Sequence, residues 1–287
     1  MTVAIGMPRV LAGKLLLALL SREQEFLNRR FVEWALAAAP RRKRRALALR
    51  LLALSPHFSD RPFGAVLKLG ALEREFARNA ATRRAIHEAL IRPRVAPSMR
   101  VLDFGCGPGY LAKAVSADVS EVIAVDVSRG VIACAALLNP ASNITYSINH
   151  RSDLRFIGTS SIDLIYSFAV IQHLETRIAA DFFREFYRVL RPGGQTLCHL
   201  VLGPGEGDRR ELRGWEKWLR LRQVRLAPAE AERMARDGGF DRVRLVPIRE
   251  LARIDDDVGR QHLMLLEKAV GPSWAPANAP AESDAAQ

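Results

Sequence analysis

Residues Val101–Tyr110 read VLDFGCGPGY and predict a strand, a glycine-rich turn and the start of a helix. Apolar residues and an Asp lead into glycines on alternate positions, at Gly105, Gly107 and Gly109. An apolar lead-in of this kind is typical of a strand buried on both faces. The glycines allow a tight turn with positive φ and let backbone N–H groups approach a ligand closely. Helical apolar spacing resumes at Tyr110, so the turn precedes a helix N-terminus, which suits polar or anionic ligand groups.

Beyond residue 99, strand-like and helix-like segments alternate, which predicts an α/β fold with a doubly wound, mostly parallel sheet. The predicted strands cover residues 100–104, 122–125, 144–148, 162–167, 195–201, 240–246 and 262–267. The predicted helices between them cover residues 110–116, 129–138, 176–190 and 229–236. We expect Ser128 to cap the helix that begins at Arg129.

The chain before this domain shows helical periodicity only. We predict helices over 8–39, 46–54 and 62–91, with Pro40 and the basic run 41–45 breaking the first from the second. The basic run could contact phosphates or lipid head groups, although a solvated helix start or loop is the simpler interpretation.

These patterns divide the chain into three parts. We expect a basic helical N-terminal extension over 1–95 that could cap a substrate, and an α/β domain over 96–268. A basic, Trp-bearing insert interrupts that domain at 203–225, and the Ala- and Pro-rich tail 269–287 is expected to be disordered.

Charge is distributed unevenly along the chain. Residues 1–95 hold 19 Lys/Arg and 7 Asp/Glu, whereas the remaining residues hold 24 of each, so the net charge of +12 belongs to the N-terminal third. This favours an anionic partner such as nucleic acid or a membrane surface, but Arg-rich composition alone is an equally simple explanation. The 3 cysteines follow no disulfide or zinc pattern, and no metal site is expected. We expect a cytoplasmic protein, with no transmembrane helix or cleavable signal peptide.

Two carboxylates fall at predicted strand ends, where ligands bind in open α/β sheets. Asp103 ends the first strand, and Asp126 ends the second, 23 residues later. A carboxylate at the second strand end is placed to accept hydrogen bonds from a ribose diol. The alternative is that Asp126 only caps the helix near Ser128.

The glycine spacing separates two kinds of nucleotide site. A dinucleotide fingerprint requires its third glycine three positions after the second, which is Tyr110 here. The third glycine instead comes two positions after the second, at Gly109, and an acidic residue precedes the first glycine by two positions. That carboxylate could face a cationic amino group.

At these residues the chain resembles the class I S-adenosylmethionine-dependent methyltransferases. The segment Asp103-Phe-Gly105-Cys-Gly107-Pro-Gly109 resembles the first motif of that family, and Asp126 matches its ribose-binding acid. Ser161-Ile-Asp163-Leu-Ile-Tyr resembles the fourth strand, and Arg191-Pro-Gly193-Gly194 resembles the turn before the fifth. The resemblance implies a seven-stranded sheet whose last strand is antiparallel, with S-adenosyl-L-methionine as the cofactor.

The resemblance also implies a set of cofactor-binding residues. Asp103 would lie near the methionine amino group and Asp126 near the ribose. The full expected set is Asp103, Gly105, Cys106, Gly107, Gly109, Asp126, Val127, Arg151 and Ser167. The chain departs from the family at His150, where many relatives carry the Asp that meets the adenine amino group. Adenine contact could pass to Arg151, Asp153 or backbone groups.

The region after the fourth strand bears on the methyl acceptor. It reads Ser167-Phe-Ala-Val, so it lacks both the Asn/Asp-Pro-Pro-aromatic turn of many amino-methyltransferases and the Pro-Cys nucleophile of cytosine-ring enzymes. His173 is a candidate general base toward a hydroxyl, with a packing role as the alternative. His199, inside the fifth strand, is expected to be a core or pocket-lining residue.

These observations favour an S-adenosylmethionine-dependent methyltransferase that acts on a small-molecule acceptor, most readily at oxygen. An RNA or protein acceptor bound by the basic N-terminal helices is the first alternative. A non-catalytic scaffold that binds the cofactor or associates peripherally with membranes is the second. The sequence gives no indication of oligomeric state.

Overall fold

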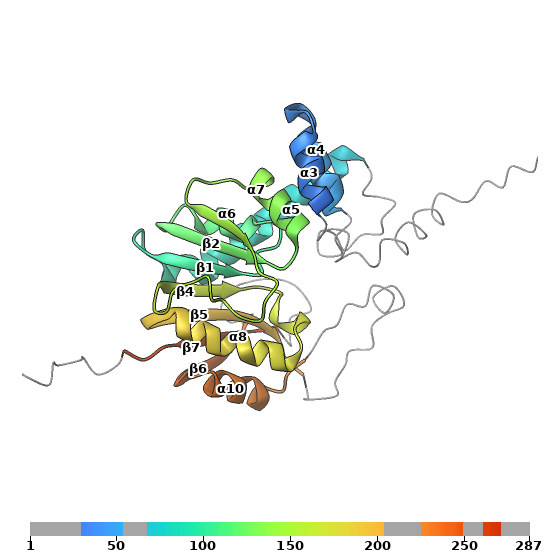
Figure 1. The fold of residues 1–287 in the computed structure, drawn as a ribbon. Coiled ribbons are helices and arrows are strands. Elements are labelled where there is room, and N and C mark those ends of the chain that lie inside the picture. Colours follow the sequence, from blue (N-terminus) through green and yellow to red (C-terminus); the bar gives the residue numbers. More distant parts are fainter. Residues whose placement is uncertain (1–29, 54–67, 204–224, 249–260, 271–287) are drawn as a thin grey trace, which may run out of the picture.

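A computed structural model describes residues 30–53, 68–203, 225–248 and 261–270, and its centre is one seven-stranded sheet (Figure 1). The strands are β1 (Arg100–Phe104), β2 (Glu121–Asp126), β3 (Ile144–Ile148), β4 (Ile162–Ser167), β5 (Leu190–Val201), β6 (Arg242–Pro247) and β7 (Gln261–Glu267). Their order is β3-β2-β1-β4-β5-β7-β6, and β7 runs antiparallel to both of its neighbours. The predicted doubly wound α/β fold with an antiparallel last strand is therefore confirmed.

Helices cover both faces of the sheet. The helices and turns before β4 are α3 (Arg30–Ala38), α4 (Arg41–Leu52), α5 (Leu69–Ile86), the π-helical turn η2 (His87–Ile91), η3 (Arg92–Arg94), α6 (Tyr110–Val115) and α7 (Arg129–Leu138). Those after β4 are η4 (Ile171–His173), α8 (Thr176–Val189) and α10 (Pro228–Asp237). Figure 1 shows α8 and α10 over the half of the sheet that contains β5, β6 and β7, with α3 and α4 at the opposite end of the molecule.

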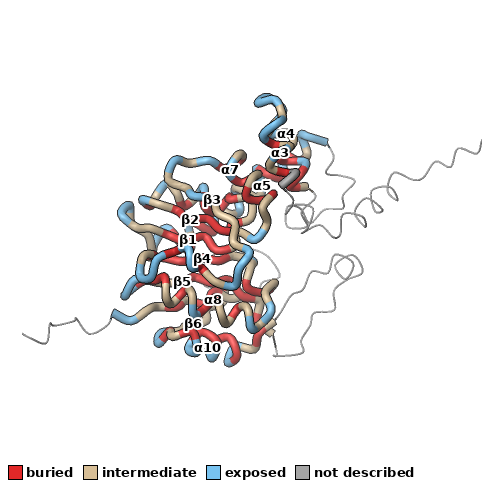
Figure 2. Tube along the Cα trace, viewed as in Figure 1, coloured by how far each residue is buried: buried red, intermediate tan, exposed pale blue. Residues whose placement is uncertain are grey.

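Side chains along β1 alternate between the two faces of the sheet and pack into different apolar clusters. Leu102 and Phe104 belong to the apolar cluster that contains α8, and the Phe104 ring lies 4.5 Å from that of Phe182. Val101 belongs to the other cluster, with residues of η2 and α6. Because strand side chains alternate, Asp103 lies on the Val101 side, under α6. Figure 2 shows the resulting buried centre running through the strands.

The basic run 41–45 forms the start of α4, in agreement with its interpretation as a helix start, but the helix begins at Arg41 and not at the predicted residue 46. The break is confined to Pro40. The Arg44 guanidinium donates to the backbone carbonyls of Ala39 and Ala37 at 2.9 and 2.7 Å, and so satisfies the end of α3. Arg45 forms a bidentate pair with Glu73 of α5, at 2.9 and 2.7 Å. Basic side chains thus join the three helices.

Some predicted boundaries were wrong by a few residues. The strand β5 begins at Leu190, before the Pro-Gly-Gly turn, because Leu190 already pairs with Ile162. Ser128 occupies the N-cap position of α7, but its side chain makes no capping hydrogen bond. The predicted helical segments 8–29 and 62–67, most of the insert 203–225 and the tail from 271 lie outside the described residues. The domain boundary at residue 95 stays a prediction.

Within the described ranges, none of the helices is both long enough and apolar enough to cross a membrane. All three cysteines are buried and free.

Candidate functional site

The carboxyl ends of β1, β2 and β4 meet at one edge of the sheet, and the glycine loop lies there. The backbone N–H groups of Gly105 and Cys106 both donate to the carbonyl of Val125, at 2.8 and 2.9 Å. These bonds fold the loop against the end of β2. As a result, the loop lies beside Asp126, the last residue of that strand.

The three glycines of the loop serve different purposes. The φ angles of Gly105, Gly107 and Gly109 are +75°, +51° and +78°. Residues other than glycine rarely adopt these values. A Cβ at Gly105 would collide with Val170, and one at Gly109 would collide with the Tyr146 hydroxyl. A Cβ at Gly107 would meet nothing within 4 Å. Gly105 and Gly109 therefore allow close packing, and Gly107 borders open space.

Asp126 fixes the glycine loop to the start of α7. Its Oδ2 accepts a hydrogen bond from the Gly107 N–H and its Oδ1 accepts one from the Ser128 N–H, both at 2.9 Å. Burial raises the pKa of Asp126, and the backbone donors act in the opposite direction. A carboxylate has about four acceptor sites, so these backbone donors leave room for a ligand hydroxyl. The side chain can thus cap the helix and also accept a hydroxyl, so its two interpretations are compatible.

Asp103 is a buried carboxyl near the end of β1. Its side chain is 2% exposed, and its Oδ2 has no hydrogen-bond partner among the described residues. Burial, and secondarily repulsion from Asp126, raise the pKa of Asp103 to about 8. A buried carboxyl oxygen without a hydrogen-bond partner is costly unless a ligand supplies a donor or a positive charge. The site therefore fits an ammonium group.

The other predicted cofactor residues lie at the same end of the sheet. Val127 follows Asp126 and is 53% exposed, so it offers an apolar face to a ligand. Ser167 ends β4, where its hydroxyl is buried without a partner among the described residues. The Cys106 thiol lies 3.6 Å from the Gly107 carbonyl, and burial raises its pKa well above the usual range. A neutral, buried thiol serves packing better than catalysis.

The loop after β3 continues the rim of the site. The Asn149 N–H donates to the backbone carbonyl of Asp126 at 2.9 Å, and the Arg151 N–H donates to Asn149 Oδ1 at 3.1 Å. His150 and Arg151 are exposed. The structure thus attaches this loop to Asp126 through Asn149, a residue that the sequence analysis did not single out.

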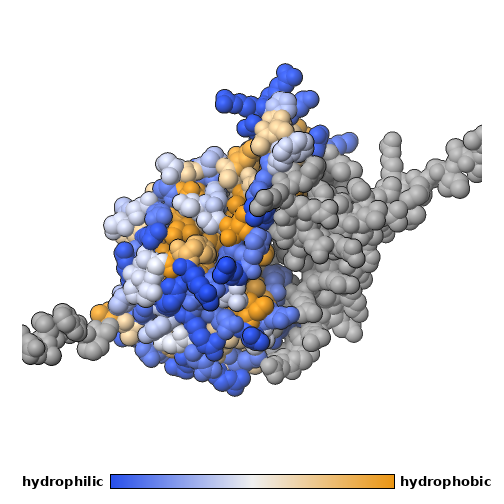
Figure 3. Space-filling model, in the orientation of Figure 1, coloured by the Kyte–Doolittle hydropathy of each residue, from blue (hydrophilic) through white to orange (hydrophobic). Residues whose placement is uncertain are grey.

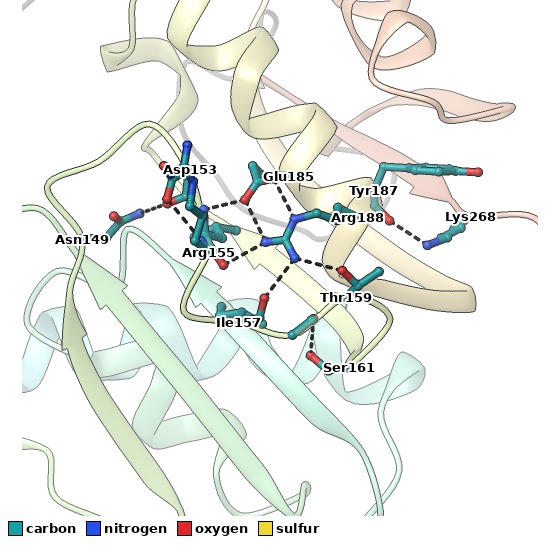
Figure 4. Close-up of polar contacts among 12 residues, drawn as sticks. Asn149, Asp153, Arg155, Ile157, Thr159, Ser161, Glu185, Tyr187, Arg188 and Lys268 are labelled. Atoms are coloured by element: carbon teal, nitrogen blue, oxygen red, sulfur yellow. Dashed lines mark hydrogen bonds and ion pairs between the residues drawn. The ribbon is translucent and has the colours of Figure 1, made fainter.

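A pair of charged residues on α8 holds the following stretch, 154–161 (Figure 4). Arg188 donates to the carbonyls of Leu154 and Ile157 at 2.9 and 3.1 Å and to the Thr159 hydroxyl at 3.2 Å. Glu185 accepts the Leu154 N–H at 2.6 Å and pairs with Arg188. The stretch 154–161 contains no helix or strand. This Glu185–Arg188 clamp supplies hydrogen-bond partners for backbone groups of that stretch.

The turn after β4 carries the candidate base. His173 ends η4, which follows directly from Ala169 and Val170. Ala169 has a φ of +61°, which is rare for a residue with a side chain. Its N–H donates to Nδ1 of His199 on β5 at 3.2 Å.

Sequence reasoning missed several residues that shape this site. Tyr166 flanks Asp103 on the adjacent strand, Val170 presses against Gly105, and Tyr146 presses against Gly109. Their partners are far apart in sequence, so no local spacing could have identified them. Arg83 of α5 was also missed, although it influences the pKa values of both Asp103 and His199.

The surface around these elements is not uniformly polar. Figure 3 shows apolar side chains gathered over β1 and β2, with hydrophilic surface over α8. Among the described residues, no group of three or more His, Cys, Asp or Glu could hold a metal ion.

Comparison with known proteins agrees with this geometry. Residues 101–194 match the protein family described as "Methyltransferase domain". An O-methyltransferase of Pyrenophora dematioidea is 29% identical over 179 residues, which cover 60% of this chain and 66% of that protein. A ubiquinone biosynthesis O-methyltransferase of Xanthomonas oryzae is 30% identical over 98 residues, which cover 33% of this chain and 40% of that protein. The matches thus span less than two thirds of each relative.

Solved structures share the fold. A chain from the complex between the Haloferax volcanii Trm112 methyltransferase activator and a methyltransferase superposes with a TM-score of 0.54 and 18% identity. It covers 69% of this chain and 94% of that one. At this identity the likeness is one of fold.

Proposed function

We propose, since the chain belongs to the class I S-adenosylmethionine-dependent methyltransferases, that it moves a methyl group from S-adenosylmethionine to the oxygen of a small-molecule acceptor. The observation that carries the cofactor site is the buried Oδ2 of Asp103, which has no hydrogen-bond partner among the described residues, in a site whose glycine loop borders open space at Gly107. When bound, S-adenosylmethionine supplies an electrophilic methyl group on a sulfonium.

The cofactor-facing residues divide by chemistry. Asp103 would face the α-ammonium group of the methionine part, and Asp126 would accept the ribose hydroxyls. Val127 offers an apolar face for the adenine ring, with Arg151 at the exposed rim. The backbone of Gly105, Cys106, Gly107 and Gly109, whose N–H groups already donate within the protein, would pass close to the space between them. Ser167 offers a hydroxyl that has no partner among the described residues. These assignments come from the family resemblance, and the exposure and hydrogen bonds given above support them.

On the acceptor side, His173 would take the proton of a hydroxyl as the oxygen attacks. Transfer between bound groups gains most of its rate from orientation, and a positioned base adds about 100- to 10,000-fold. The location of His173 on the turn after β4 supports this role, because that turn lies at the edge of the sheet where the cofactor loop also lies. The names of the two O-methyltransferase relatives support oxygen as the acceptor atom.

A macromolecular acceptor is the second candidate, favoured by the exposed Arg41, Arg42 and Lys43 at the start of α4. Binding of RNA through these side chains would weaken steeply as salt is raised. The proposal of a small-molecule acceptor predicts no such dependence.

The test is formation of S-adenosylhomocysteine with a panel of phenols, carboxylic acids, amines and RNA. We expect turnover with an oxygen acceptor, and loss of about 100-fold in kcat for His173→Gln with unchanged affinity for S-adenosylhomocysteine. Turnover restricted to RNA would contradict the proposed acceptor class. Unchanged kcat in His173→Gln would remove the base.

A further inference from the structure

We propose that His199 is a positioning residue, which holds the turn 168–173 in the one conformation that seats it against the glycine loop. The proposal rests on the proposed function for its binding measurement, and on the structure alone for its exchange measurement.

The contacts of His199 are directed at this turn and not only at the core. The ring is 8% exposed and lies parallel to the Phe168 ring, with centroids 6.2 Å apart and planes inclined by 4°. Its Nδ1 accepts the Ala169 N–H, and its Nε2 lies 3.2 Å from Gln261 Oε1 on β7. Since Nδ1 accepts, the proton is assigned to Nε2, which donates to Gln261. Both ring nitrogens are thus used.

The turn needs such a contact because its backbone is strained. Ala169 adopts a φ of +61°, a conformation that persists only where surrounding contacts impose it. The Ala169 N–H donates to Nδ1 of His199 and would lose this acceptor if the ring were removed. His199 supplies the acceptor from a neighbouring strand, which is rigid.

The conformation has a consequence at the cofactor loop. Val170 follows the strained residue and fills the space that a Cβ on Gly105 would need. His173 ends the same turn, where its N–H donates to the Val170 carbonyl at 2.8 Å. A single hydrogen bond from β5 therefore sets the positions of both the residue that packs on the cofactor loop and the candidate base.

The protonation state of His199 agrees with this role. Burial lowers the pKa of His199 to about 4, and the charges of Arg83 and His173, from α5 and η4, act in the same direction. Gln261 acts in the opposite direction through its hydrogen bond. The ring is therefore neutral near pH 7 and keeps Nδ1 available as an acceptor. It is also a poor general base at that pH, which separates its role from that of His173.

The test removes the ring nitrogens of His199 and then asks whether a second substitution, at Ala169, restores ligand affinity. His199→Phe keeps a ring against Phe168 but removes both nitrogens, and we expect it to weaken S-adenosylhomocysteine binding about tenfold. Adding Ala169→Gly removes the strain, because glycine adopts positive φ freely, and should restore affinity to within about threefold. Thr196→Val, on the same strand, removes a buried hydroxyl that has no partner among the described residues and should change nothing.

A second measurement does not depend on cofactor binding. Hydrogen exchange in residues 167–174 should be faster in His199→Phe than in the wild type, and unchanged in Thr196→Val. Unaltered exchange, or an affinity loss that Ala169→Gly fails to reverse, would overturn the proposal. If His199→Phe alone is insoluble, the double variant is expected to fold, and its failure to fold would also overturn it. A wild-type chain that binds no S-adenosylhomocysteine would contradict the proposed function and leave the exchange result to decide the role of His199.

Discussion

At the scale of single residues, the glycine loop shows that similar backbone angles can serve different ends. Gly105 and Gly107 both have positive φ, but only Gly105 is enclosed by a side chain, that of Val170. Adding a methyl group should therefore cost more stability at Gly105 than at Gly107. It should cost more ligand affinity at Gly107, where the methyl group would enter open space.

We expect Gly107→Ala to lower the free energy of unfolding by about 1 kcal/mol, from backbone strain alone. Gly105→Ala adds the collision with Val170 and should lower it by about 3 kcal/mol. Chemical denaturation measures both. Gly107→Ala should still weaken S-adenosylhomocysteine binding at least tenfold, because its new methyl group enters the open space. Equal losses of stability in the two variants would contradict the packing role of Gly105.

Asp103 makes stability depend on pH. Its pKa is raised to about 8 in the folded protein, against about 4 in an unfolded chain. Between these values the unfolded state ionises and the folded state does not, so the wild type loses stability as pH rises from about 4 to 8. Asp103→Asn lacks this loss.

The two unfolding free energies should therefore diverge by a few kcal/mol across that range, with the variant the more stable at pH 8. Taking the difference between the proteins removes the contribution of Asp126, which titrates in both. Parallel stability curves would show that Asp103 is already ionised in the folded protein.

At the scale of elements, α8 does more than cover the sheet. The Glu185–Arg188 clamp fixes 154–161, a stretch without helix or strand between β3 and β4 (Figure 4). Arg184 on the same helix also pairs with an acid, Asp181, but its side chain is 59% exposed. The two arginines therefore form a matched pair of test sites.

Arg188→Leu should lower the free energy of unfolding by about 2 kcal/mol, because buried carbonyls lose their donors. Arg184→Leu should change it by less than about 0.5 kcal/mol, as is usual for an exposed pair. Thermal denaturation of both variants checks this. Similar small shifts would mean that 154–161 holds its conformation without the clamp.

The sequence was most informative about elements and least informative about contacts between them. The seven strand segments were predictable because apolar runs and glycine turns are local signals, whereas the antiparallel direction of β7 was expected only from the family resemblance. The Ala169–His199 hydrogen bond was not, because 30 residues separate its partners. The start of α4 was predicted too late because charge and the adjacent proline suggested a break over 41–45, whereas Arg44 and Arg45 bind α3 and α5.

At the scale of the whole molecule, the proposed cofactor-binding residues lie along one edge of the sheet. The ends of β1, β2 and β4 carry Asp103, Asp126 and Ser167, with the glycine loop between them. The N-terminal helices pack beside this edge through α5, whose Phe76 ring lies 4.9 Å from that of Tyr110, the first residue after the loop. The arrangement predicts one cofactor site per chain.

Calorimetric titration of the protein with S-adenosylhomocysteine measures whether this edge of the sheet binds the cofactor. We predict binding of one molecule per chain, weakened tens- to hundreds-fold in Asp126→Ala, since hydrogen bonds to a charged group contribute about 1.5–3 kcal/mol each. Asp181→Asn, at an exposed site on α8, serves as the control and should bind like the wild type. Absence of binding to the wild-type protein, or equal affinity in Asp126→Ala, would contradict the assignment of the cofactor site.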